Sequence, residues 1–187
     1  MELAEHPKNM NLPLESVPVR PRNAARAPVS VPETAREGLL EVPGEIALHH
    51  GGRLQGMHIA WRMVGPANAP VICALGGISA NRRVCLTEDA RQSWWSEIVG
   101  PGRAIDARAF RILSFDYLGG SGESTGPQAG EGFPSLSTYD QAEVLVRLLN
   151  HLGVKSLRAI AGGSYGGMVA LAFGERYPER VSQLFVI

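Results

Sequence analysis

Features that would place a chain in a specialised class are scarce in this sequence. Its 187 residues include two cysteines, Cys73 and Cys85, twelve positions apart. That spacing is neither a metal-ligand motif nor a disulfide framework, so we expect free thiols in a reducing compartment and no metal site. The 18 basic and 18 acidic residues cancel, and no surface for nucleic acid or an anionic membrane is therefore expected.

Long apolar runs are also missing. None reaches the length of a membrane span, and the N-terminal residues M-E-L-A-E-H-P-K contain no apolar segment of the kind found in a secretory signal. The chain is 44% hydrophobic and 19% charged, which is typical of a globular protein. We expect a cytoplasmic protein with no membrane partner.

Proline divides the chain into two parts. Residues 1–40 carry six prolines and little periodicity, which predicts an extended or disordered arm. Residues 41–187 then form one domain, because their length suits a single core. Within it we expect a β-hairpin at 45–50 and 57–64, strands at 70–75, 110–115, 157–161 and 183–187, and helices at 138–152 and 166–177, with 87–99 at least partly helical.

This alternation predicts an α/β protein with a mostly parallel sheet flanked by helices. A hairpin precedes the parallel strands, as in the opening half of an α/β-hydrolase fold. The remaining strands and helices of that fold have no counterpart in these residues, so we expect the C-terminal half of the fold to be missing from this chain.

The chemistry centres on residues 162–166, which read G-G-S-Y-G and match G-x-S-x-G. An apolar strand precedes the motif and an apolar helix follows it, the context of a nucleophile elbow. Ser164 is the predicted nucleophile, and glycines beside it allow strand and helix to approach closely. The backbone N–H of Tyr165 is the predicted oxyanion donor. The alternative is a chance match in a chain with 22 glycines.

Two further loops follow predicted strands. Gly76-Gly77 opens the first, and the backbone N–H of Ile78 is our candidate for the second oxyanion donor; an ordinary glycine turn is the alternative. The second loop, 116–126, is rich in glycine but has no lysine in the position of a phosphate-binding loop. We expect Asp116 to hold that loop by hydrogen bonds rather than to act in catalysis.

Neither an Asp nor a His follows the predicted nucleophile. In this fold an Asp or Glu and then a His come after the serine, yet residues 165–187 contain no Asp and no His. We therefore expect the acid and base of the triad to be absent from this chain, which would be an inactive N-terminal portion of a longer enzyme. The alternatives are a complete but non-catalytic binding protein, or a different topology that recruits His49, His50 or His151 as base.

Three segments carry a resemblance to a known family. Residues 94–106 (W-W-S-E-I-V-G-P-G-R-A-I-D) resemble its W-W…G-P-G-K-x-x-D segment, and 118–127 (L-G-G-S-G-E-S-T-G-P) resemble its L-G-G-x-x-G-S-T-G-P loop. Residues 162–168 (G-G-S-Y-G-G-M) resemble its G-G-S-M-G-G-M elbow. The family is that of the homoserine O-acyltransferases, within the α/β-hydrolase superfamily.

The resemblance implies transfer of an acetyl or succinyl group from acyl-CoA to the hydroxyl of L-homoserine, a step in methionine biosynthesis. It implies an acyl-enzyme on Ser164, no cofactor besides the co-substrate acyl-CoA, and a homodimer. The choice between acetyl and succinyl stays open. Residues 115–117 (F-D-Y) and 75–79 (L-G-G-I-S) depart from the family pattern, the first toward general esterases, so a serine esterase is the alternative.

Overall fold

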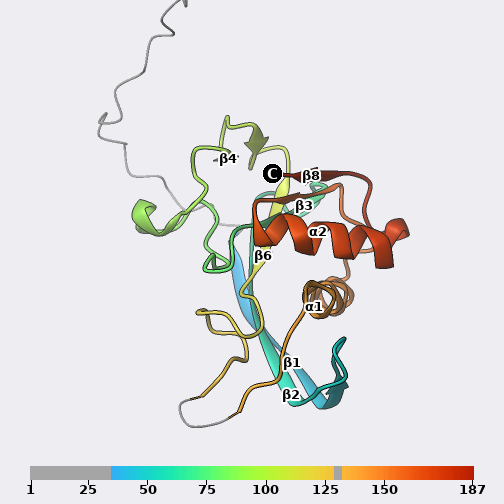
Figure 1. Ribbon diagram of the computed structural model, residues 1–187. Helices are drawn as coiled ribbons and strands as arrows, with labels where there is room; N and C mark the ends of the chain where they lie inside the picture. The colour runs from blue at the N-terminus through green and yellow to red at the C-terminus, as the bar shows by residue number, and fades with distance from the viewer. Residues whose placement is uncertain (1–34, 129–131) are drawn as a thin grey trace, which may run out of the picture.

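A single six-stranded sheet forms the centre of the protein, seen in a computed structural model that describes residues 35–128 and 132–187. The strand order is β1-β2-β6-β3-β7-β8 (Figure 1). β2 is antiparallel to both its neighbours, whereas β6, β3, β7 and β8 run parallel to one another. The strands span Arg36–Ala47 (β1), Arg53–Val64 (β2), Val71–Leu75 (β3), Arg111–Phe115 (β6), Ala159–Gly162 (β7) and Leu184–Val186 (β8).

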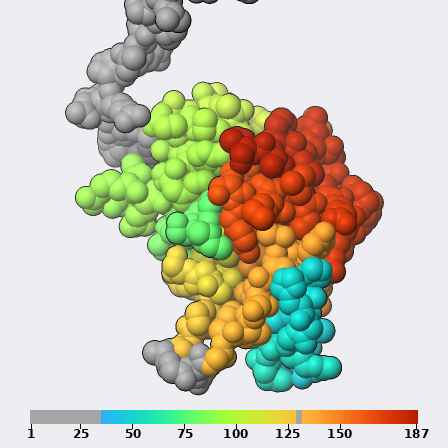
Figure 2. All heavy atoms as spheres, viewed as in Figure 1, coloured from blue at the N-terminus to red at the C-terminus, as the bar shows by residue number. Residues whose placement is uncertain are grey.

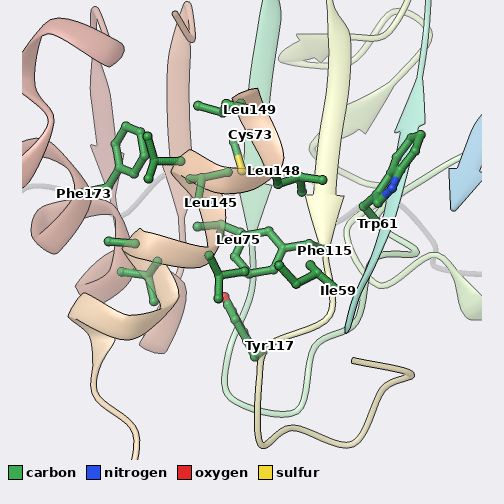
Figure 3. Packing of buried hydrophobic residues seen from close by; sticks show 14 of the residues in the cluster. Ile59, Trp61, Cys73, Leu75, Phe115, Tyr117, Leu145, Leu148, Leu149 and Phe173 are labelled. Carbon is green, nitrogen blue, oxygen red and sulfur yellow. The ribbon is translucent and has the colours of Figure 1, made fainter. Parts of the chain in front are cut away.

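Both α-helices among the described residues lie on one face of the sheet (Figure 1). α1 (Thr138–His151) begins with a capping box in which Ser137 and Asp140 satisfy each other's backbone amides. α2 (Tyr165–Arg176) follows β7 directly. Side chains from both helices meet the strands in one apolar core, and Figure 3 shows Leu145, Leu148 and Phe173 converging on Cys73 and Leu75.

The opposite face of the sheet is covered by the segment between β3 and β6. It carries a second apolar cluster that includes Ile72, Val84 and Val99. Alternate residues of β3 face the two clusters, which explains why that strand is apolar throughout. The segment contains a 3-10 turn, η1 (Ala90–Gln92), and two short parallel strands, β4 (Val99–Gly100) and β5 (Ile105–Asp106). A second 3-10 turn, η2 (Pro178–Arg180), lies between α2 and β8.

The predicted helical character of 87–99 is confirmed only for the three residues of η1. The backbone N–H groups of Trp94 and Trp95 donate to the carbonyls of Arg83 and Val84, and the Trp94 indole donates to the carbonyl of Asn81. Those amides are therefore not available for helical hydrogen bonds. Tertiary contacts of the two tryptophans override the local preference for helix.

β1 begins earlier than the sequence predicted. It starts at Arg36, so the last residues of the range 1–40 belong to the sheet, while residues 1–34 of the predicted arm lie outside the described part of the chain. Pro43 and Gly44 sit at a bulge where the pairing with β2 shifts register, and an edge strand tolerates proline there. The hairpin prediction itself is confirmed, since β1 and β2 pair along their length.

β8 forms one edge of the described sheet, and apolar side chains cluster beside it. Phe185 and Ile187 are 54% and 80% exposed. They border a hollow of about 350 Å³ on the face away from the α-helices, which Trp95 and Phe110 also line. In Figure 2 the residues at the end of β8, in dark red, lie on the surface against the green segment that precedes β6.

We expect the 187-residue chain to self-associate through this surface, because contiguous exposed apolar area at a strand edge favours association. Phe185→Asp should shift the weight-average mass measured by light scattering toward that of the monomer. Leu39→Asp is the matched control, since Leu39 is 53% exposed on the opposite edge strand. Equal effects of the two substitutions would contradict a role for the β8 surface.

No helix among the described residues combines the length and the apolarity needed to cross a membrane.

Candidate active site

Ser164 occupies a sharp turn between β7 and α2. Its backbone has φ 53° and ψ −120°, a combination that residues with a side chain rarely adopt. Leu86 is the only other non-glycine residue of the described chain with positive φ. The Ser164 side chain is exposed. A strained backbone that presents a hydroxyl to solvent is the local geometry that a nucleophile elbow requires.

Glycines beside Ser164 are required by close approach of backbone segments. A Cβ at Gly162 would lie 2.3 Å from the carbonyl oxygen of Gly166, and a Cβ at Gly166 would lie 2.5 Å from that of Leu75. The expectation that these two glycines let strand and helix nearly touch is confirmed. Gly163 differs, because a Cβ there would meet nothing within 4 Å.

Hydrogen bonds from both neighbouring strands hold the turn. The Ser164 N–H donates to the carbonyl of Ile187 at 2.8 Å, and the Ile187 N–H donates to that of Gly162 at 2.9 Å. On the other side, the Gly163 N–H donates to the carbonyl of Leu75 at 3.0 Å. The turn is thus fixed between β3 and β8, which offsets the cost of its backbone conformation.

The two predicted oxyanion donors lie in two segments, the loop after β3 and the start of α2, that one hydrogen bond joins. Tyr165 is the first residue of α2, and Ile78, 61% exposed, lies in the loop after β3. Within the described residues neither backbone N–H donates a hydrogen bond, so both are available to a ligand. The Gly166 N–H donates to the Gly76 carbonyl at 2.9 Å and so joins the loop to the helix. The two amides remain candidates on these grounds.

Asp116 holds the loops around the site, as expected. Its Oδ1 accepts from the Arg82 N–H at 2.7 Å, and its Oδ2 accepts from the Arg82 guanidinium at 2.5 Å and from the Glu123 N–H at 2.8 Å. One buried carboxylate thereby ties the loop after β3 to the loop after β6. The carboxylates of Glu37 and Glu123 also pair with Arg82. Nothing in the sequence around Arg82 indicated this role.

None of the three histidines considered as bases, His49, His50 and His151, forms a hydrogen bond with Ser164. The His49 ring packs 4.6 Å from that of Tyr139 and 4.9 Å from that of His50, and His151 is the exposed last residue of α1. Among residues 35–128 and 132–187, no side chain forms a hydrogen bond with the Ser164 hydroxyl. The described residues also contain no group of three or more His, Cys, Asp or Glu arranged to hold a metal ion.

Both cysteines are free and buried. Burial raises the pKa of Cys85 to about 11, against the opposing effect of the Arg62 charge. Burial likewise raises the pKa of Cys73. Both thiols therefore stay protonated at neutral pH, and neither competes with Ser164 as a nucleophile.

Replacing Ser164 by glycine should stabilise the fold while removing the hydroxyl. Glycine adopts positive φ freely, so relief of roughly 2 kcal/mol of strain outweighs roughly 1 kcal/mol of added unfolded-state entropy. We expect a net gain of about 1 kcal/mol in the free energy of unfolding, measured by urea titration. Ser121→Gly is the control, since exposed Ser121 has no positive φ, and it should lose stability. A loss at both positions would contradict strain at the elbow.

The fold agrees with the comparisons to known proteins. The α/β hydrolase fold family matches residues 70–187, and the chain belongs to this family. Its fold class is thereby confirmed. The solved structure of esterase E22 shares the fold, with a TM-score of 0.72 and 23% identity over 82% of this chain and 47% of that chain.

Within the family, curated relatives of this chain include homoserine O-acetyltransferases and O-succinyltransferases, which confirms the resemblance found in the sequence. The homoserine O-acetyltransferase of Methanosarcina acetivorans is 34% identical over 162 residues, which are 79% of this chain and 30% of that protein. The homoserine O-succinyltransferase of Azoarcus sp. is 34% identical over 157 residues, which are 76% of this chain and 42% of that protein. The chain thus spans less than half the length of these relatives.

Proposed function

We propose that this chain carries the nucleophile of an acyl-CoA-dependent homoserine O-acyltransferase, with Ser164 as the residue that is acylated. The observation that carries the proposal is the elbow: an exposed serine at φ 53° between two glycines that have no room for a side chain. Similarity to homoserine O-acetyl- and O-succinyltransferases supports the substrate class.

In the first step, the Ser164 oxygen attacks the thioester carbonyl of acyl-CoA. A carbon–oxygen bond forms, the carbon–sulfur bond breaks, and CoA leaves as a thiol after taking up the proton that the serine loses. The backbone N–H groups of Tyr165 and Ile78 are the proposed donors to the oxyanion. Tyr165 lies at the N-terminus of α2, whose dipole favours negative charge there.

In the second step, the hydroxyl of L-homoserine attacks the acyl-serine ester, and Ser164 regains its proton as the ester bond to it breaks. Transfer exceeds hydrolysis only when the amino acid is held in line and water is excluded. The proposal needs no cofactor besides acyl-CoA as co-substrate. A homodimer and a cytoplasmic location, in methionine biosynthesis, belong to the same proposal.

We infer that the acid and base for these steps do not come from residues 1–187. No side chain of the described residues bonds the Ser164 hydroxyl, and no Asp or His follows it in this sequence. A serine without a base keeps its high pKa and reacts slowly. We propose that the acid and base lie outside these residues and that the 187-residue chain alone does not turn over acyl-CoA and homoserine.

A general serine esterase is the second candidate. The specific observation in its favour is the segment 115–117, which departs from the acyltransferase pattern. Its Asp116 accepts the hydrogen bonds that tie the loop after β3 to the loop after β6. An esterase would share the elbow and accept water in place of homoserine. A non-catalytic binding protein is the third candidate, because Ser164 has no base among the described residues.

Reading the gene beyond codon 187 is the first experiment, because it shows whether an Asp and a His follow. The protein encoded by the complete reading frame is then assayed with acetyl-CoA or succinyl-CoA plus L-homoserine, and separately with a p-nitrophenyl ester. We expect acyl transfer that Ser164→Ala abolishes. Ester hydrolysis without acyl transfer would support the esterase, and a stop codon after 187 with a stable folded product would support the binding protein.

A further inference from the structure

Tyr117 is a buried hydroxyl that the proposed reaction does not use. It lies two residues beyond β6, is 2% exposed, and sits at the lower end of the core below Leu75 and Phe115 in Figure 3. Its hydroxyl donates to the carbonyl oxygen of Gly76 at 2.9 Å. Burial, assisted by the nearby Cys73 and Tyr165, raises the pKa of Tyr117, so it remains a hydrogen-bond donor throughout the neutral range.

The Gly76 carbonyl is the point where the loop after β3 meets the elbow. It accepts from the Tyr117 hydroxyl and from the Gly166 N–H, both at 2.9 Å, and two such bonds use both lone pairs of a carbonyl oxygen. A peptide unit is planar, so fixing this oxygen also fixes the direction of the Gly77 N–H and the path of the chain to Ile78. The loop that carries the candidate oxyanion amide of Ile78 thus begins at a peptide whose carbonyl oxygen is held by two hydrogen bonds.

The Tyr117 ring is itself held by the residue that follows the nucleophile. The rings of Tyr117 and Tyr165 meet edge to face at 5.0 Å, and Phe115 contacts Tyr117 in the same manner at 5.6 Å. The loop after β3 is also closely packed at Gly76, because a Cβ there would lie 2.4 Å from the Cβ of Ala80. Tyr165 therefore contributes one candidate donor through its amide and supports the other through its ring.

We propose that Tyr117 is a positioning residue for the oxyanion hole, which acts by holding the Gly76 peptide so that the amides after it face the carbonyl carbon attacked by Ser164. This rests on the proposed role of Ser164. The hydroxyl does not touch the substrate. Its loss should therefore slow the attack of Ser164 without weakening the binding of the reagent, because only the alignment of the donor amides changes.

The test uses the protein encoded by the complete reading frame, because the acid and base are proposed to lie outside residues 1–187. The reagent is a fluorophosphonate ester, which phosphonylates serine with loss of fluoride and needs no acyl-CoA. Rates at increasing reagent concentration separate the maximal labelling rate from the concentration for half-maximal rate. Tyr117→Phe should lower the maximal rate about tenfold, as the weakening of one hydrogen bond allows, at an unchanged half-maximal concentration. Tyr177→Phe is the matched control: it removes a different tyrosine hydroxyl bond, a partly buried one to Glu143, and should label at the wild-type rate.

A second readout does not depend on reactivity. In ¹⁵N-labelled protein, Tyr117→Phe should shift the amide resonances of Gly77 and Ile78 and speed hydrogen exchange at Gly166, while Tyr177→Phe should leave all three unchanged. Wild-type labelling and unchanged amides in Tyr117→Phe would overturn the positioning role and leave only a core hydrogen bond. If Ser164→Ala labels as fast as wild type, the proposed nucleophile is wrong, and the positioning proposal is overturned with it.

Discussion

Gly162→Ala is expected to lower the free energy of unfolding by about 3 kcal/mol, the upper end of the usual cost of overpacking. The added methyl group would lie 2.3 Å from the carbonyl oxygen of Gly166 and 2.7 Å from the amide nitrogen of Gly167. Both contacts are to backbone, so no side-chain rotation can relieve them. β7 and α2 must move apart, and the hydrogen bonds that hold the elbow must lengthen. Urea titration of the purified chain measures the loss.

Gly163→Ala is the matched control, one position along the same turn. A Cβ there meets nothing within 4 Å, and Gly163 does not have positive φ. The free energy of unfolding should therefore stay within about 0.5 kcal/mol of wild type. A similar loss for Gly162→Ala and Gly163→Ala would show that the turn is sensitive to any side chain, and it would contradict close backbone approach as the cause.

Asp116→Asn is expected to cost about 3 kcal/mol, because it leaves the buried Arg82 guanidinium without its closest carboxylate. The side chains of Asp116 and Arg82 are 1% and 8% exposed, so water does not replace the lost charge. Glu37 and Glu123 continue to pair with Arg82, which places the loss at the lower end of the range for broken buried pairs. Thermal and urea unfolding measure the effect.

The control for this prediction is Asp89→Asn. Asp89 pairs with Arg91 at 3.0 Å, but the Arg91 side chain is 91% exposed. Solvent and salt screen such a pair, so the substitution should leave the unfolding midpoint nearly unchanged. Equal losses for the two variants would mean that burial does not set the strength of the Asp116 interaction.

Most of the parallel sheet and the elbow could be predicted because their signals are local. Apolar runs such as 70–75 and 110–115 are read from a few consecutive residues, and the structure forms β3 and β6 there. Gly162 and Gly166 flank Ser164 in the pattern of a tight strand–turn–helix. The physical reason is that a Cβ at either glycine would lie within 2.5 Å of a backbone carbonyl oxygen. The helical character expected in 87–99 is limited to η1, because the backbone N–H groups of Trp94 and Trp95 donate to residues 83 and 84 instead of forming helical turns.

The sequence by itself therefore determined the class of fold, the family and the position of the candidate nucleophile, because strand, turn and helix signals lie within a few residues of one another. Only the tertiary structure decided how the loops around Ser164 are held. Arg82 meets Asp116 across 34 positions, and Tyr117 meets Gly76 across 41. Such pairs leave no local pattern, because the sheet brings them together only after β3, β6 and β7 have aligned.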